Sequence, residues 1–306
     1  MPGVPNRREI VCGRVDDLDR AARGAASGRP RAIHRARVAS RRLSELLPLL
    51  QVEVDRRRRF GRDLRRLRRA LGPLRETDVL IGLVDDLAGQ SPGSARGLAA
   101  VRAALAADRR EALERAQRNG VERRLRRTVK RLRSLVEGVG GHEGAAGRRW
   151  RWVLDALVAR RAQALIDAVV SAGADEVAER VHEVRIRLKK LRYAVELAEV
   201  ARGVVATPEL RRLTRQQALL GRLHDRQVLA ERIRQVQAPS AGVDRQASDE
   251  LNPVLSGLDG ECRTLHARYL RSRASIQVAC RGLLARAGGV ATRGHAGVTK
   301  RAAAGR

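Results

Sequence analysis

The chain has 306 residues and carries 64 lysine and arginine residues against 34 aspartate and glutamate residues, a formal net charge of +30. A charge of this size predicts a polyanionic partner or an acidic surface and says little about the fold. Only four of the cations are lysines, so the charge consists mainly of guanidinium groups, whose planar donors suit phosphate oxygens. The length and the 43% hydrophobic content allow one large core, or two of about 150 residues each.

Cysteine usage and the lack of long apolar segments narrow the class of protein further. The three cysteines are an odd number without a CxxC motif, which argues against a disulfide framework and for a reducing compartment. No stretch approaches the roughly 18 apolar residues that a membrane span needs, and the N-terminus has no apolar signal segment. We therefore expect a cytoplasmic protein.

Apolar residues recur at helical spacing along most of the chain and strand signals are nearly absent, which predicts an all-α fold. In chain order, helix boundaries are expected at 27–30, 71–73 and 90–93, where glycine and proline interrupt the pattern. Each predicted helix then has an apolar face toward a core and a charged face toward solvent.

The middle and the end of the chain have a different composition. A glycine-rich linker at 138–148 divides one predicted domain, 7–287, into halves 7–139 and 149–287. From residue 288 onward the chain is glycine, alanine, arginine and threonine without periodicity. We expect a disordered basic tail at 288–306.

A short cationic segment occurs in the first half and again 148 residues later. Each copy contains a histidine, a nearby arginine and a basic pair, namely His34, Arg37, Arg41 and Arg42, then His182, Arg185, Lys189 and Lys190. A second pair of segments, 71–80 and 220–229, matches at an offset of 149. Two matches in the same order predict an internal duplication, with two helical bundles related by a pseudo-two-fold axis.

Helical projection places a cationic row beside the apolar face in each copy. The rows consist of His34, Arg37 and Arg41, and of His182, Arg185, Lys189 and Tyr193, with Arg192 at the border. Cations one turn apart repel each other unless carboxylates or a polyanion lie against them, and neither row has enough acid nearby. One such row is typical of a solvated surface, whereas two matched rows favour an anion site, where histidine takes its protonated form. For Tyr193, a hydroxyl donor and a cap on the core edge stay equally open.

Further arginines lie on the outer faces of other predicted helices. Arg62 and Arg66 are one turn apart and align with Arg211 and Arg215 at the second offset, so these pairs belong to the repeated pattern. A similar row lies within 123–131. For these outer rows, diffuse attraction and direct ligand contact stay equally open.

The paired segments resemble the CHAD family, the conserved histidine α-helical domain, over roughly residues 10–285. The residues that carry the resemblance are His34, Arg37, Arg41, Arg42, Leu43, His182, Arg185, Lys189, Lys190, Leu191, Arg192 and Tyr193, with the two later matched segments. The resemblance implies a duplicated bundle of four helices per half. It also implies that inorganic polyphosphate binds in a basic central groove, commonly at polyphosphate granules.

The chain departs from the family pattern in several places. Ser44 stands where another arginine is usual, and Pro48 should bend the end of that helix. Glu76 replaces a usual aspartate, for which we expect pairing with a buried basic side chain. Family members often carry an N-terminal triphosphatase-like domain with an acidic metal-binding strand motif. We expect no such domain before this one, so the resemblance implies no catalysis.

The sequence therefore predicts non-catalytic binding of inorganic polyphosphate, without a cofactor or metal. The expected binding residues are His34, Arg37, Arg41, Arg42, His182, Arg185, Lys189, Lys190, Arg192, Tyr193, Arg62, Arg66, Arg211 and Arg215. The alternative is a nucleic-acid-binding basic helical protein, although only five aromatic residues are present and none is interleaved with the cationic rows. An enzyme is a weaker alternative, because Glu179 and His182 form a single ExxH motif and there is no P-loop or HExxH.

Overall fold

The computed structural model describes residues 4–50, 52–138, 145–173, 178–238 and 244–303, with backbone alone for 145–148, 178 and 288–303. Within this part of the chain all regular elements are helices, which confirms the all-α fold class. The α-helices are α1 Arg7–Ala26, α2 Pro30–Leu46, α3 Val54–Ala70, α4 Gly72–Gln90, α5 Ala95–Arg118, α6 Val121–Glu137, α7 Ala145–Ser171, α8 Ala178–Val200, α9 Pro208–Gln237, α10 Arg245–Asp249 and α11 Leu251–Ala303. Two short 3₁₀ turns, Leu47–Leu49 and Pro92–Ser94, lie between them.

Local sequence signals set many of the helix ends. A capping box opens α1, where the Asn6 side chain accepts from the Glu9 amide at 3.0 Å and Glu9 accepts from the Asn6 amide at 2.8 Å. Pro30 and Pro73 lie in the first turns of α2 and α4, where a missing amide proton costs nothing. Pro48 lies in the 3₁₀ turn that follows α2, as its effect on that helix end predicts.

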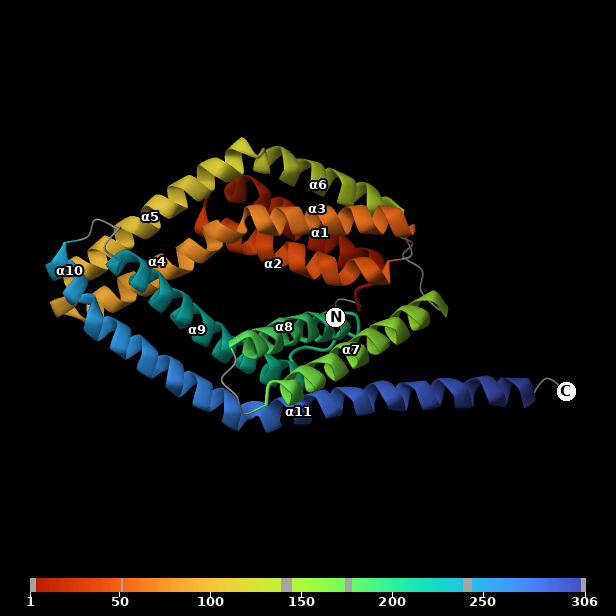
Figure 1. Ribbon diagram of the computed structural model, residues 1–306. Coiled ribbons are helices and arrows are strands. Elements are labelled where there is room, and N and C mark those ends of the chain that lie inside the picture. Colours follow the sequence, from red (N-terminus) through yellow and green to blue (C-terminus); the bar gives the residue numbers. More distant parts are fainter. Residues whose placement is uncertain (1–3, 51, 139–144, 174–177, 239–243, 304–306) are drawn as a thin grey trace.

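Two groups of helices pack around a common apolar core. In the first group α1 packs on α2 and α6, and α3 packs on α2 and α6; in the second, α7 packs on α8 and α11, and α9 packs on the same two helices (Figure 1). The apolar faces predicted for the repeated segments are buried, apart from the half-buried Val181. Among the described residues, no helix is both long and apolar enough to cross a membrane.

An arm extends from the two groups and has a core of its own. α4 and α5 lead away from the first group, and the C-terminal part of α9 and the N-terminal part of α11 lead away from the second, with α10 at the tip (Figure 1). The buried residues of this second core are Leu80, Val84, Leu98, Val101, Leu105, Leu229, Ala230, Ile233, Val236, Leu251, Val254 and Leu258. The arm therefore has its own apolar support, separate from the core beneath the repeated segments.

The boundaries predicted along the chain differ in detail from the structure. α6 ends at Glu137 and α7 begins at Ala145, so the last residues of the predicted 138–148 linker are helical and 139–144 lie outside the described residues. The backbone of α11 continues as helix through Ala303, whereas a tail without regular structure was expected from residue 288. Alanine in this segment favours the helix, whereas glycine, which is equally frequent there, opposes it.

Candidate functional site

The two cationic rows lie on α2 and α8, which are neighbours across the two halves of the chain. The pKa of Lys189 on α8 is lowered to about 7, first by burial and then by Arg185 and by Arg41 of α2. The pKa of Arg185 is lowered by burial and by the same Arg41. The structure thus brings Arg41 close to Arg185 and Lys189, which are more than 140 residues away in sequence.

Arginines of α3 and α4 and a histidine of α9 join these rows. Burial, followed by Arg75, Arg41 and Arg37, lowers the pKa of His34. Arg37 donates to the backbone carbonyl of Arg68 at 2.6 Å. We define the central cationic cluster as His34, Arg37, Arg41, Arg68, Arg75, His182, Arg185, Lys189 and His224.

The cluster holds more positive charge than the nearby carboxylates can balance. Burial lowers the pKa of Arg37 and of Arg68 to about 10, and other arginines contribute to both shifts. Asp225 and Glu76 are nearby acids, and they act in the opposite direction on Lys189 and on Arg37, respectively. Because desolvated like charges repel strongly, a polyanion bound here would relieve a cost already present in the free protein.

Histidines line one side of the cluster. The rings of His182 and His224 have their centroids 5.8 Å apart, and both residues line a cavity of about 320 Å³ together with Arg185. Burial, then Arg185 and His182, lowers the pKa of His224 to about 4, so its ring is neutral near pH 7 in the free protein. A neutral imidazole donates one hydrogen bond, and a bound anion would favour a second proton.

Four residues of this region were missed by the sequence prediction: Arg68, Arg75, His224 and Asp225. The alignment of the halves contained a signal for three of them, because Arg75 aligns with His224 and Glu76 with Asp225 at the offset of 149. These positions follow the glycine of the second matched segment. Glu76 was expected to pair with a buried basic side chain; it raises the pKa of Arg37, but among the described residues it makes no ion pair with it.

Ser44, which stands where the family resemblance predicts an arginine, is contacted by an arginine from another helix. Arg68 of α3 donates to the Ser44 hydroxyl at 2.7 Å and to the Ser40 carbonyl at 3.0 Å. At the aligned positions of the second half, Arg192 of α8 donates to Gln217 of α9 at 2.7 Å. An arginine therefore bridges α2 to α3, and another bridges α8 to α9. The donor lies on the second helix of the first pair and on the first helix of the second pair.

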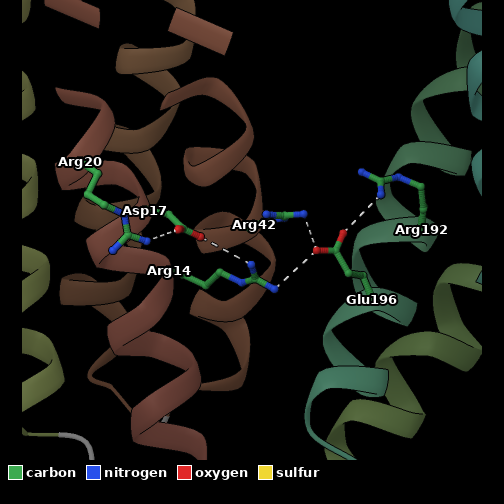
Figure 2. Close-up of polar contacts among 6 residues, drawn as sticks. All are labelled: Arg14, Asp17, Arg20, Arg42, Arg192 and Glu196. Carbon is green, nitrogen blue, oxygen red and sulfur yellow. Dashed lines mark hydrogen bonds and ion pairs between the residues drawn. The ribbon is translucent and has the colours of Figure 1, made fainter. Parts of the chain in front are cut away.

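Arg42 and Arg192, which were predicted to bind the ligand, contact a carboxylate away from the central cluster. Glu196 of α8 accepts from Arg42 of α2 at 2.6 Å, from Arg192 at 3.3 Å and from Arg14 of α1 at 3.4 Å. Figure 2 shows these three guanidinium groups converging on the Glu196 carboxylate, with Asp17 on the far side of Arg14. This Glu196 cluster joins α1 and α2 to α8.

The remaining predicted residues lie at the margins. Tyr193 is buried, 6% exposed, with the Arg192 guanidinium 4.3 Å from its ring centroid, which matches a cap on the core edge. Lys190 is half-buried on α8. The pairs aligned between the halves lie on exposed positions of α3 and α9, namely Arg62, Arg66, Arg211 and Arg215.

The donor set of the central cluster suits phosphate oxygens. Guanidinium, ammonium and imidazole groups supply many donors, and guanidinium binds phosphate in a bidentate manner. Among the described residues, no three His, Cys, Asp or Glu side chains gather in a way that could hold a metal ion. The arrangement can bind and neutralise a chain of negative charges.

Comparisons with known proteins agree with this fold. The crystal structure of the CHAD domain from the plant Ricinus communis is similar, with a TM-score of 0.57, 21% sequence identity and 90% of each chain covered. PptA from Streptomyces chartreusis is also similar, with a TM-score of 0.57, 19% identity, and coverage of 90% of this chain and 95% of that one. At these identities the likeness shows the fold alone, and no curated protein matches the chain. The CHAD domain family itself matches residues 9–234, and this chain belongs to that family.

Proposed function

We propose that this protein binds inorganic polyphosphate, without catalysis, in a basic groove between its two halves. The observation that carries the proposal is the proximity of Arg41 on α2 to Arg185 and Lys189 on α8. Under this proposal the halves are duplicated bundles with pseudo-two-fold symmetry, and each supplies one wall of the groove. The protein would act in the cytoplasm, at polyphosphate granules.

Polyphosphate suits this cluster better than a nucleic acid does. Single-stranded nucleic acids are usually bound on exposed aromatic rings, which stack on the bases. Of the five aromatic residues only Trp152 is exposed, and it lies on α7 rather than on α2 or α8. A phosphate polymer has no bases, so rows of cationic donors are sufficient, with counterion release supplying much of the affinity.

The test replaces cations of both rows together, as Arg41→Gln, Arg185→Gln and Lys189→Gln. Arg37 is left intact, because its hydrogen bond to the Arg68 carbonyl ties α2 to α3. We expect polyphosphate affinity to fall at least about a hundredfold, since each charged hydrogen bond contributes roughly 1.5–3 kcal/mol. Affinity is measured by titration calorimetry, with thermal melting as the check on folding.

The matched control removes the same charge from the end of the chain, as Arg293→Gln, Lys300→Gln and Arg301→Gln. Equal losses in the two variants would show that binding is diffuse, and the groove proposal would be wrong. Competition adds a second criterion, because displacement of labelled polyphosphate by equal phosphate equivalents of duplex DNA would favour the nucleic-acid alternative. Rapid phosphate release with Mg²⁺, abolished by His182→Ala, would overturn the non-catalytic assignment.

A further inference from the structure

A second concentration of arginines lies outside the central cluster, between α3 and α6. A cavity of about 430 Å³ in this place is lined by seven arginines and a single carboxylate, Asp63. We call it the outer arginine cleft, and its arginines are Arg59, Arg62, Arg66, Arg123, Arg124, Arg127 and Arg131. Asp63 already accepts from Arg131 at 3.0 Å, so it neutralises only one of them.

Most of this charge has no carboxylate partner among the described residues. In the part of the chain that the structure describes, Arg59, Arg62, Arg66 and Arg127 make no ion pair. Arg62 and Arg66 are one helical turn apart on α3, as are Arg123 and Arg127 on α6, and like charges at this spacing repel each other. Two such rows across one cleft form a site for a polyanion.

A neighbouring cavity connects the outer arginine cleft to the central cluster, because it shares one lining residue with each of them. Arg62 also lines this neighbouring cavity of about 460 Å³, whose other lining residues include Arg65 and Arg68. Arg68 belongs to the central cluster, because its pKa is lowered by burial and then by Arg41. From Arg62 to Arg68 the rise along α3 is about 9 Å. A basic path therefore leads from the centre, along α3, to the cleft.

We propose that the outer arginine cleft is a second binding segment for polyphosphate, filled by long chains whose ends extend beyond the central cluster. This inference rests on the proposed function and adds a chain-length preference to it. A chain held at the centre presents its free end to the cleft at a high effective concentration, so the second contact costs little entropy. Short chains fill only the central cluster and gain nothing from the cleft.

A phosphate polymer also fits the cleft better than a nucleic acid does. The nearest aromatic residue in sequence, Phe60 of α3, is buried at 4% exposure and offers no stacking surface. The other lining groups are Asn119, Gly120 and Thr128, which are small and polar or lack a side chain. Forked guanidinium donors on both walls suit successive phosphate groups.

The test neutralises the cleft with Arg62→Gln, Arg66→Gln and Arg127→Gln, three exposed positions. The control variant, Arg8→Gln, Arg160→Gln and Arg245→Gln, removes the same charge from exposed arginines that line neither cavity. Affinities for short-chain and long-chain polyphosphate are measured for both. We expect the cleft variant to lose about tenfold more long-chain affinity than the control, with short-chain affinity within about twofold of wild type.

The salt dependence gives an independent readout of the same contacts. With about 0.7 counterions released per phosphate contact, losing three contacts should make the negative slope of log affinity against log salt shallower by roughly 2, for long chains only. Equal losses for both chain lengths, or equal losses in cleft and control variants, would overturn the inference. Failure of the proposed function would appear differently, as short-chain binding that survives the central substitutions Arg41→Gln, Arg185→Gln and Lys189→Gln.

Discussion

At the scale of single residues, Lys189 is the group whose charge depends most on its surroundings. Its ammonium lies among Arg185, Arg41 and Arg37, with Asp225 as the opposing charge, and it lowers the pKa of His224 in turn. With a pKa of about 7, it exchanges its proton in the physiological range. Lysine can change charge in this way, whereas arginine cannot.

Polyphosphate binding should therefore be linked to proton uptake. A bound polyanion favours the charged form of Lys189, so affinity should rise as the pH falls from about 8 to about 6. Calorimetry in buffers of different ionisation enthalpy measures the proton taken up. Lys189→Arg, which stays charged, should bind well and lose most of this pH dependence; an unchanged pH profile in that variant would contradict the assignment.

The lowered pKa of Lys189 also affects the stability of the free protein, but with the opposite pH dependence to that of ligand affinity. In the unfolded chain Lys189 keeps its ordinary pKa of 10.5, so between pH 7 and 10.5 the unfolded state binds more protons. The contribution of Lys189 to the free energy of unfolding therefore rises with pH across this window. Ligand should remove the effect, because the bound site holds the proton.

At the scale of elements, the Glu196 cluster holds α1 and α2 against α8. The Glu196 side chain is 16% exposed and accepts from Arg14, Arg42 and Arg192 (Figure 2). One carboxylate thus sets the spacing of the two helices that carry the cationic rows. Without it, three guanidinium groups would repel one another across the contact between the halves.

Glu196→Gln should destabilise the protein by about 2–4 kcal/mol, because it leaves partly buried cations without their acceptor. Chemical denaturation measures the change in the free energy of unfolding. The control is Glu122→Gln, whose carboxylate is 57% exposed and pairs with Arg126 on the same helix. That change should stay within about 0.5 kcal/mol. Equal effects of the two substitutions would show that the Glu196 cluster does not hold the helices together.

At the scale of the whole molecule, the separate core of the arm allows stability and binding to be tested apart. Gly97 lies near the start of α5, where α10 and the first residues of α11 pack against it, and its amide donates to Glu250 at 3.1 Å. A Cβ at this position would lie 2.5 Å from the Ala247 carbonyl oxygen and 2.7 Å from Leu251 Cγ. Only glycine permits this approach of α10 and α11 to α5.

Gly97→Ala should therefore destabilise the arm by about 1–3 kcal/mol, the usual cost of overpacking. Gly82→Ala in α4 is the matched control, because its Cβ would meet no atom within 4 Å, and it should stabilise the helix by about 0.5–1 kcal/mol. Thermal melting compares the two. Polyphosphate affinity should be unchanged in both variants, since the central cluster lies on the other core; a loss in Gly97→Ala would show that the arm contributes to binding.

Particular residues show how far the sequence could predict the site. His34, Arg37, Arg41, His182, Arg185 and Lys189 repeat at helical spacing beside an apolar face, and that pattern needs only the geometry of one helix. Arg68 could not be found in this way, because it has no basic counterpart in the second half, where Gln217 aligns with it. Arg42 and Arg192 carry the same charge as their neighbours, and only the position of Glu196 separates them from the cluster.

The sequence by itself determined the all-α class, the faces that enter the core, the helix ends at proline and glycine, and the surplus of cations. These properties depend on local periodicity and composition, which are present in any short segment of the chain. The tertiary structure alone decided that Arg41 lies near Lys189, that Arg42 pairs with Glu196 and that arginines of α3 face those of α6. Such contacts join residues far apart in sequence, and their distances depend on how whole helices pack rather than on any local pattern.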